Sequence, residues 1–353
     1  MNKPRTLPLI LSVSAVILWA CAAPASPTAV AISTFPVPAE PAATEEPVHL
    51  KVGTLGYMSN GPVFIAQDEG LFAEQGLEVE LIDFGFTERD MVAASMQGQI
   101  DAMTVAMSVA VLSGIEQGAN ARYVADKGFA NPEACASDGF LARKELLEAG
   151  TLEDLSNLRG MTIVSRTGNI IEYVTDKLLE RAALSMEDMQ PEPIVDPAVY
   201  VEGMGAGTVD LAPVGEPWIT RARLGGAADL WLPYSDLIPN TSVAGIVFGP
   251  SMLERPDDVG VRFMVAYLRA VDRFQNDRSD RIVEIISEHT GLPAEEIEQV
   301  CWNSIHPDGK IDTDGLAGFL SWATAKGYTE AALGVDQVWD GRFVEQAYPL
   351  VTP

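Results

Sequence analysis

The chain has 353 residues, of which 50 are Asp or Glu and 23 are Lys or Arg, so its formal net charge is −27. This acidic balance argues against binding to nucleic acid or to anionic lipid surfaces, because both carry negative charge. The same field disfavours an anionic ligand, although a solvated surface suited to an extracellular protein is the simpler interpretation.

Residues 1–20 have the features of a lipoprotein signal peptide. A basic start precedes an apolar stretch, Leu7 to Trp19, that is too short to span a bilayer comfortably, and Leu18-Trp19-Ala20-Cys21 resembles a lipobox. We therefore expect a lipid on Cys21, palmitate included, that anchors the chain to the extracytoplasmic face of the cell membrane. The alternative is an ordinary secretory signal with an incidental cysteine.

Residues 21–47 are rich in Ala, Pro, Ser and Thr and offer little apolar surface to bury, which predicts a flexible lipidated tether. The folded part is expected to begin near Val48. The remaining length can bury a large core and is sufficient for two lobes. We predict that residues 48–130 and 245–353 form the first lobe and that residues 131–244 form the second.

The start of the folded part alternates between strand-like and helix-like patterns. Short apolar runs at Leu50–Leu55, Val79–Phe84 and Ala102–Ala106 predict strands. Between them, Pro62–Glu74 and Glu88–Met96 carry apolar residues three and four positions apart, as amphipathic helices do. This β-α-β-α-β order predicts a parallel sheet with its ligand site at the carboxyl ends of the strands.

Two stretches of sequence carry a family resemblance. They read GYMSNGPVFIAQDEGLFAEQGLEVELIDF and QGQIDAMTVAMSVAVLSGIEQGA. Together they resemble the start of ABC-importer substrate-binding proteins, most nearly the thiamine-pyrimidine-synthesis-like proteins and the sulfonate, nitrate and taurine binders. The resemblance extends from about Val48 to about Phe274. It implies an α/β, type II periplasmic-binding-protein fold, with two lobes, a hinge and a ligand cleft, in a protein that serves a permease with its ATPase.

Polar and aromatic residues in the turns at the strand ends are the candidate ligand-binding residues, because hydroxyls, amides and helix N-terminal N–H groups bind polar edges and rings stack on flat ligands. In the first lobe they are Tyr57, Ser59, Asn60, Phe86, Thr87 and Ser108. In the second lobe they are Ser165, Thr167, Asn169, Glu172, Tyr173, Glu216 and Trp218, with Asn240 near the hinge.

Each candidate also has a structural interpretation. Tyr57 and Phe86 are equally suited to core or rim packing. Trp218 can pack its helix onto the lobe, Glu216 can favour a helix N-terminus, and Ser or Thr residues in turns are often helix caps. Cys135 and Cys301 can pair in an oxidising compartment or remain two buried thiols.

The chemistry of these turns favours a neutral heteroaromatic ligand. Arg166 is the only strong cation in them, whereas an anion site usually gathers several Arg, Lys or N–H groups. Within the resembled group this favours riboflavin, whose ring system would stack and whose polyol tail would meet hydroxyls, and a thiamine pyrimidine comes next. The alternative is a sulfonate, nitrate or taurine-type anion.

Enzymatic readings find little support. His49, His289 and His306 are far apart in sequence, and no H-E-x-x-H, Walker-type or G-x-S-x-G motif is present. The rival enzyme of the resembled superfamily synthesises the thiamine pyrimidine, and it needs a first-lobe histidine and clustered cysteines. We expect no catalytic residue, no cofactor and no metal, and a monomer that captures its ligand by lobe closure. A membrane-tethered sensor or adhesion module is a further alternative.

Overall fold

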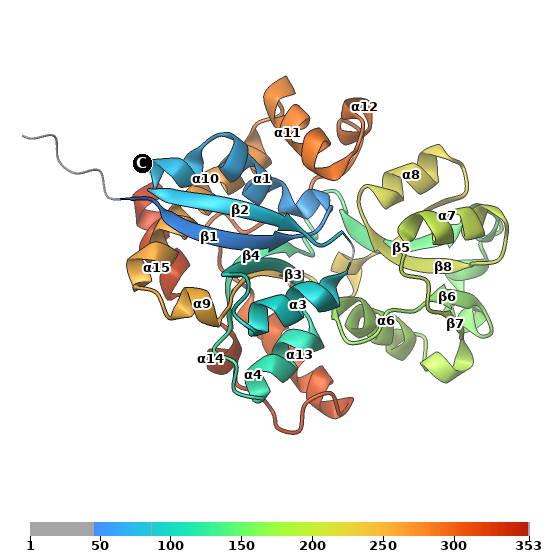
Figure 1. Cartoon of the computed structure of the whole chain (residues 1–353). Helices are drawn as coiled ribbons and strands as arrows, with labels where there is room; N and C mark the ends of the chain where they lie inside the picture. The colour runs from blue at the N-terminus through green and yellow to red at the C-terminus, as the bar shows by residue number, and fades with distance from the viewer. Residues whose placement is uncertain (1–45, 86, 352–353) are drawn as a thin grey trace, which may run out of the picture. The chain divides into compact units, whose positions relative to one another are not determined.

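The computed structural model describes residues 46–85 and 87–351. The predicted signal peptide, Cys21, nearly all of the tether and Phe86 lie outside the described residues, and the statements about them stay predictions. The described part contains two mixed α/β sheets, each covered by helices (Figure 1). We call each sheet with the helices packed on it a lobe. No helix in this described part is both long and apolar enough to cross a bilayer.

The sheet of the first lobe has the strand order β2-β1-β3-β10-β4. Its strands are β1 (Val48–Thr54), β2 (Leu77–Asp83), β3 (Ala102–Ala106), β4 (Arg122–Phe129) and β10 (Ser242–Phe248). β1 pairs in parallel with both β2 and β3, which confirms the β-α-β-α-β prediction. β10 returns late in the sequence and lies antiparallel between β3 and β4.

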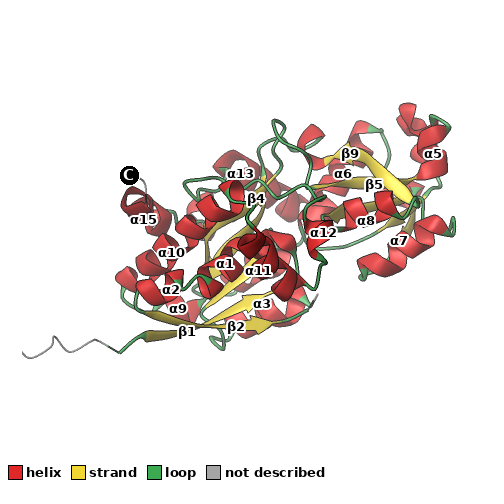
Figure 2. Ribbon diagram, turned by 90° about the horizontal axis from the view of Figure 1, so that it is seen from above, coloured by secondary structure: helices red, strands yellow, loops and turns green. Residues whose placement is uncertain are grey.

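Helices cover both faces of this sheet (Figure 2). The helices on one side of the sheet are α1 (Gly61–Asp68), α2 (Leu71–Glu74), α9 (Pro250–Leu253), α10 (Asp257–Asn276), α11 (Asp280–Thr290) and α15 (Arg342–Val351). The helices on the other side are α3 (Glu88–Met96), α4 (Val109–Glu116), α13 (Thr313–Ala325) and α14 (Val335–Val338). α10 directs Val259, Phe263, Tyr267, Val271 and Phe274 into the core at helical spacing.

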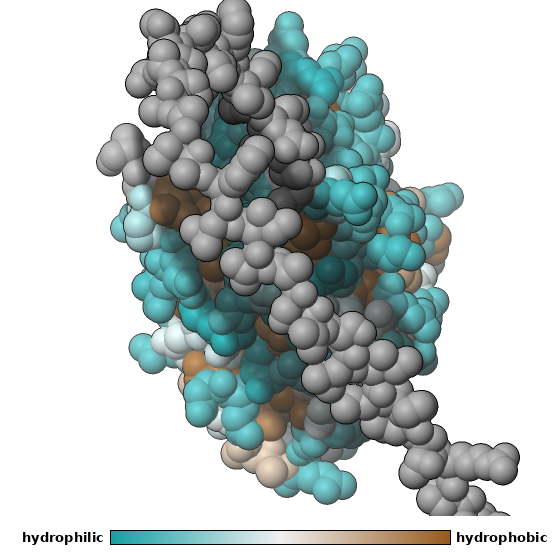
Figure 3. Space-filling model, turned by 60° about the vertical axis from the view of Figure 1, so that its left-hand side comes forward, coloured by the Kyte–Doolittle hydropathy of each residue, from teal (hydrophilic) through white to brown (hydrophobic). Residues whose placement is uncertain are grey.

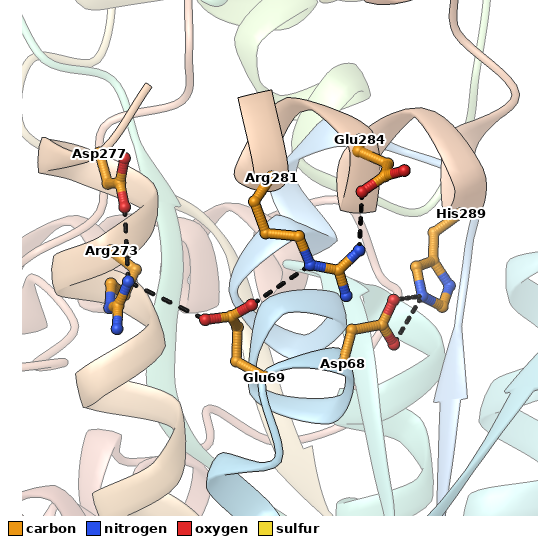
Figure 4. Close-up of polar contacts among 7 residues, drawn as sticks. All are labelled: Asp68, Glu69, Arg273, Asp277, Arg281, Glu284 and His289. Atoms are coloured by element: carbon orange, nitrogen blue, oxygen red, sulfur yellow. Dashed lines mark hydrogen bonds and ion pairs between the residues drawn. The ribbon is translucent and has the colours of Figure 1, made fainter. Parts of the chain in front are cut away.

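A glycine allows α1 and α10 to approach each other closely. Gly61 begins α1 directly against Phe274 of α10, and a Cβ at this position would overlap the Phe274 ring. Around the other end of α1, charged side chains tie this helix to α10 and α11 (Figure 4). Glu69 pairs with both Arg273 and Arg281, at 3.9 and 3.4 Å. These exposed pairs each contribute little to stability, because solvent screens them.

The sheet of the second lobe has the strand order β7-β6-β8-β5-β9. Its strands are β5 (Asp138–Arg143), β6 (Thr162–Val164), β7 (Gln190–Glu192), β8 (Leu211–Gly215) and β9 (Ala228–Pro233). Its helices are α5 (Lys144–Glu148), α6 (Ile170–Arg181), α7 (Pro197–Gly205) and α8 (Trp218–Leu224). β6 lies parallel to β7 and β8, whereas β5 lies antiparallel to β8 and β9.

Two segments cross between the sheets, one from β4 to β5 and one from β9 to β10. They are hydrogen-bonded to each other, because the Asn240 N–H donates to the Ala130 carbonyl at 2.8 Å and the Ala130 N–H donates to the Thr241 carbonyl at 3.0 Å. Asn240 has a φ of +62°, a left-handed conformation that asparagine adopts more readily than most residues. The crossing pair has the form of a hinge.

The C-terminal region, which the sequence predicts as part of the first lobe, contacts both lobes. α13 packs on α6 of the second lobe, where Tyr173 meets Phe319 edge to face and Trp322 Nε1 donates to Asp176 at 2.7 Å. α12 (Ala294–Ile297) reaches α8 through a forked Arg221–Glu296 ion pair. Cys135 and Cys301 form a disulfide, which settles the pairing that the sequence left open.

The visible surface is mainly hydrophilic. Figure 3 shows separate hydrophobic patches among hydrophilic side chains on the face that it presents. Within the described ranges, the large apolar residues that are exposed are Val195, Val199, Leu224 and Leu350. Scattered exposure of this kind is ordinary for a folded protein and does not define an interface.

Candidate functional site

A cavity of about 130 Å³ lies between the two lobes. Its walls come from the carboxyl ends of β1 and β3 in the first lobe and from those of β6 and β8 in the second, where α/β sheets collect ligands. The lining residues from the first lobe are Leu55, Tyr57, Ser59, Glu88, Thr104, Ala106, Lys127, Gly128, Val243 and Ala244. Those from the rest of the chain are Asp138, Arg166, Asn169, Ile170, Ile171, Pro197, Tyr200, Pro213, Val214, Gly215, Glu216, Trp218, Tyr234 and Asn303.

Five of the residues predicted from the sequence line this cavity. They are Tyr57, Ser59, Asn169, Glu216 and Trp218. Asn169 is at the same time the N-cap of α6, since its side chain accepts a hydrogen bond from the Ile171 N–H at 3.0 Å. Asn169 therefore both caps a helix and lines the cavity.

Other predicted residues of the strand-end turns lie behind the wall or away from it. Asn60 is fully buried and donates to the Leu55 carbonyl, while its Oδ1 has no partner within the described part. Ser108 caps α4 through the Ala110 N–H at 3.3 Å. Thr87 precedes α3 and Thr167 lies in the turn before α6, and both are exposed. Ser165, whose N–H bonds to the Glu192 carbonyl, does not line the cavity.

Three more predicted residues lie elsewhere for identifiable reasons. Glu172 is buried and accepts hydrogen bonds from the Gly168 N–H and the Tyr328 hydroxyl, both at 2.7 Å. Tyr173 is buried against Phe319 and Trp322 of α13 and does not line the cavity. Asn240 belongs to the hinge described above. Phe86 is outside the described residues.

Two cationic side chains line the cavity. Lys127 of β4 is 4% exposed, and its Nζ donates to Ser59 Oγ at 2.8 Å. Burial lowers the pKa of Lys127 to about 8, against the opposing charges of Asp138, Asp126 and Glu88. Arg166 forms no hydrogen bond or ion pair with any described residue. Its guanidinium is thus available to a ligand.

Three carboxyl groups also line the cavity, namely those of Glu88, Asp138 and Glu216. Burial raises the pKa of each, while hydrogen bonds lower it. For Glu88 the opposing influences are a hydrogen bond with Ser108 and the positive charges of Arg166 and Lys127. Charges of both signs therefore meet at one small site.

Aromatic side chains complete the walls. Tyr57, Tyr200, Trp218 and Tyr234 all line the cavity. Arg221 lies over the Trp218 ring at 4.8 Å, which holds the ring from outside. Burial raises the pKa of both Tyr200 and Tyr234, so their hydroxyls stay protonated and can donate hydrogen bonds near neutral pH.

Sequence reasoning missed several lining residues, above all Lys127, Asp138 and Tyr200. One signal was available for Lys127, since two charged residues interrupt the apolar run of β4 in the sequence Tyr-Val-Ala-Asp-Lys-Gly-Phe. A charge within a buried strand usually has a partner or a function. Tyr200 lies within a helix rather than in a turn, and no local pattern marks it. No three His, Cys, Asp or Glu side chains of the described ranges come together as metal ligands would.

Two α/β lobes with a cavity at their facing strand ends define the periplasmic-binding-protein fold of ABC import proteins, as the resemblance implied. The model of the NMT1-like family matches residues 43–228, which is more than half of the chain. The chain belongs to the NMT1-like family. No curated protein matches its sequence.

Solved structures support the same fold. The periplasmic nitrate-binding protein NrtA from Synechocystis PCC 6803 has a TM-score of 0.70 at 17% identity, over 87% of this chain and 90% of that one. The alkanesulfonate-binding protein SsuA from Xanthomonas axonopodis pv. citri, bound to MOPS, has a TM-score of 0.66 at 18% identity, over 83% and 99%. The desulfurization enzyme DszB has a TM-score of 0.62 at 13% identity, over 86% and 100%. At these identities the likeness concerns the fold.

Proposed function

We propose that this protein is the extracytoplasmic substrate-binding component of an ABC importer and that it captures a small organic anion between its lobes. The observation that carries the ligand class is Arg166, whose guanidinium lines the cavity without a hydrogen bond or ion pair to any described residue. Lys127 adds a second positive charge on the opposite lobe. Together the two cations offset the unfavourable field of the acidic surface locally.

The rest of the ligand would meet rings and carboxyl groups. Tyr57 and Trp218 offer faces for an apolar body. Asp138 and Glu88 can accept hydrogen bonds from N–H or O–H groups of the ligand. The proposed ligand is therefore a small molecule with one anionic group and at least one hydrogen-bond donor, a description that amino-sulfonates fit. The solved sulfonate- and nitrate-binding structures support this proposal through their fold.

Riboflavin, which the sequence alone favoured, is the second candidate, and the four aromatic rings of the cavity support it. The volume speaks against it, because about 130 Å³ lies below the roughly 300–1,000 Å³ of pockets that hold drug-sized ligands. A wide ring system would need the lobes further apart.

The residues that line the cavity favour a protein that captures its ligand over an enzyme that converts it. Among the described residues that line the cavity there is no histidine and no cysteine. Arg166, Lys127 and the three carboxyl groups can bind and orient a ligand. DszB shares the fold and is an enzyme, so a conversion assay belongs beside the binding assay.

The test is a thermal-unfolding screen of the purified protein with taurine, methanesulfonate, MOPS, nitrate, riboflavin and the thiamine pyrimidine. A ligand at a hundred times its Kd stabilises the native state by about 2.7 kcal/mol. We expect a sulfonate to raise Tm, and Arg166→Gln to abolish the shift. Arg181→Gln, which changes an exposed arginine of α6, is the matched control and should retain it.

A shift with riboflavin alone that survives Arg166→Gln would replace the anion by a neutral ring. A permease and an ATPase encoded beside the gene would support the importer role. Their absence would favour the membrane-tethered sensor. Consumption of a bound compound, followed by chromatography, would overturn capture without conversion.

A further inference from the structure

The second lobe brings two carboxyl groups, those of Asp138 and Glu216, to the cavity wall. Asp138 begins β5 and Glu216 directly follows β8, and the two strands pair with Asp138 opposite Gly215. A Cβ on Gly215 would lie 2.5 Å from Asp138 Oδ1, so glycine leaves the space that the carboxyl group occupies. Carboxylates in a partly buried place need hydrogen-bond donors to stay charged.

The donors to these carboxyl groups come from two distant parts of the chain. Asp138 Oδ2 accepts from the Ser137 hydroxyl at 2.7 Å and from the Asn303 amide at 3.3 Å. Glu216 Oε1 accepts from the Cys301 backbone N–H at 3.2 Å. The carbonyl of Ser137 in turn accepts the Glu216 N–H at 2.8 Å.

These donors cluster around the disulfide. Ser137 lies two residues after Cys135, and Asn303 lies two residues after Cys301. The disulfide joins segments 166 residues apart in sequence and brings their Cα atoms within 5.8 Å. Neither cysteine lines the cavity, so the sulfur atoms themselves are not ligand groups.

Noncovalent contacts also hold the segment that carries Cys301, among them the Phe129 N–H that donates to the Ser304 carbonyl at 3.0 Å and the burial of Val300 and Ile305 in the core. On the first lobe, the Gln275 side chain donates to the Asn303 carbonyl at 2.8 Å, and Arg278 lies 3.7 Å over the Trp302 ring. On the second lobe, the Arg221–Glu296 pair holds the preceding helix. The disulfide is the covalent link between this segment and the residues that begin β5.

We propose that the Cys135–Cys301 disulfide positions the carboxyl groups of Asp138 and Glu216 at the cavity by holding in place the groups that donate to them. Cys135 and Cys301 are then positioning residues. Any effect of these positioned carboxyl groups on ligand binding rests on the binding function proposed above. Without the covalent link, the Asn303 amide and the Cys301 N–H can leave the carboxyl oxygens, which then remain partly buried with fewer donors.

Other charged and polar groups also face the two carboxyl groups and stay in place. Lys127 and Tyr234 face Asp138. Glu216 keeps Thr220, which donates its N–H at 3.0 Å and its hydroxyl at 2.9 Å, and Arg223 lies nearby. Asp138 should therefore respond more strongly than Glu216 to loss of the link.

The test follows both carboxyl groups directly and needs no ligand. The full chain is labelled with ¹³C in the Asp and Glu carboxyl groups, and pH titrations are recorded by NMR, with Asp138→Asn and Glu216→Gln to assign the two signals. Cys135 is exposed, so a phosphine reductant can reach the disulfide. After reduction, and in Cys135→Ala/Cys301→Ala, the Asp138 midpoint should rise by about one pH unit, since loss of a donor disfavours the charged form.

A second variant keeps the test decisive if loss of the disulfide unfolds the protein. Asn303→Ala retains the disulfide and removes only the amide donor, so it should raise the Asp138 midpoint and leave that of Glu216 unchanged. Asn157→Ala, which alters an exposed second-lobe asparagine, is the control. Unchanged Asp138 titration after reduction or in Asn303→Ala overturns the proposal. Because no ligand is present, this result and that of the ligand screen can fail independently.

Discussion

Ser108 and Asn169 lie opposite each other in an antiparallel bridge between the two lobes. The Val109 N–H donates to the Gly168 carbonyl and the Ile170 N–H donates to the Met107 carbonyl, each at 2.8 Å. Ser108 and Asn169 also cap α4 and α6, so each lobe contributes the N-terminus of a helix to the contact. The lobes are thus joined at the cavity by main-chain hydrogen bonds as well as at the hinge.

We expect Val109→Pro to favour an open arrangement of the lobes. Val109 is the first residue of α4, where proline is well tolerated, and the substitution removes the N–H that bonds to Gly168. Loss of one such hydrogen bond costs about 1 kcal/mol, which would shift the open–closed equilibrium roughly five-fold. Small-angle X-ray scattering should then report a larger radius of gyration.

Val109→Ala is the matched control for this prediction. It shortens the side chain and keeps the N–H, so its scattering should remain that of the wild type. If Val109→Pro and Val109→Ala scatter alike, the bridge does not govern lobe closure.

A second prediction concerns Lys127 and pH. The pKa of Lys127 is lowered by burial from 10.5 to about 8, so between these values the folded state binds fewer protons than the unfolded state. The free energy of unfolding of the wild type, taken relative to that of Lys127→Met, should therefore rise with pH in that window. The expected rise is about 1–2 kcal/mol between pH 8 and pH 9.5. Urea unfolding at several pH values measures the difference.

Lys144→Met provides the comparison, since Lys144 is an exposed lysine of the second lobe. The difference between this variant and the wild type should not change over the same pH range. If the difference in free energy of unfolding between the wild type and Lys127→Met is also independent of pH, Lys127 is not desolvated in the folded protein.

The strand-end rule accounts for what the sequence could predict of the site. Tyr57, Ser59, Asn169, Glu216 and Trp218 follow strands whose ends meet at the cavity, and local patterns reveal such positions. The same rule selects residues such as Ser165 and Thr167, because it identifies the turn but not the direction of a side chain.

What the sequence could not predict depends on contacts between distant segments. Asn303 reaches the cavity because the C-terminal segment returns to the second lobe, and the disulfide holds it there. Tyr173 is buried by α13 for the same reason. Nothing in the sequence pattern of α13 says which lobe it will contact.

A third prediction concerns Glu172, which contacts residues directly after α13 and does not line the cavity. The Tyr328 hydroxyl donates to Glu172 at 2.7 Å, and Lys326 pairs with Glu172 at 3.3 Å. Tyr328→Phe should lower the free energy of unfolding by about 1–2 kcal/mol, because a hydrogen bond to a charged group is lost. The Tm shift caused by a sulfonate should be unchanged, since Glu172 does not line the cavity.

Glu180→Gln, which changes an exposed carboxylate of α6 paired with Lys177, should alter stability by less than about 0.5 kcal/mol. A reduced ligand response in Tyr328→Phe would return Glu172 to the binding site that the sequence predicted for it.

A final prediction concerns the pair of His306 and Asp126 beside the hinge. His306 Nδ1 lies 3.1 Å from Asp126 Oδ2, and its ring stacks on Phe129 with the ring centres 3.8 Å apart. Burial lowers the pKa of His306, but the hydrogen bond and the negative charge of Asp126 outweigh it, so the pKa is raised above 6.5. A raised folded-state pKa stabilises the protein fully below the unfolded value and ceases to do so as pH rises through the folded value.

The stability advantage of the wild type over His306→Gln should therefore be largest below pH 6.5 and should shrink as the pH rises above it. Urea unfolding from pH 5.5 to pH 8.5 measures this difference. His49→Gln is the control, because the side chain of His49 is 74% exposed in its pair with Glu78. An advantage that stays constant with pH, or grows as the pH rises, would show that His306 is not held in its charged form by Asp126.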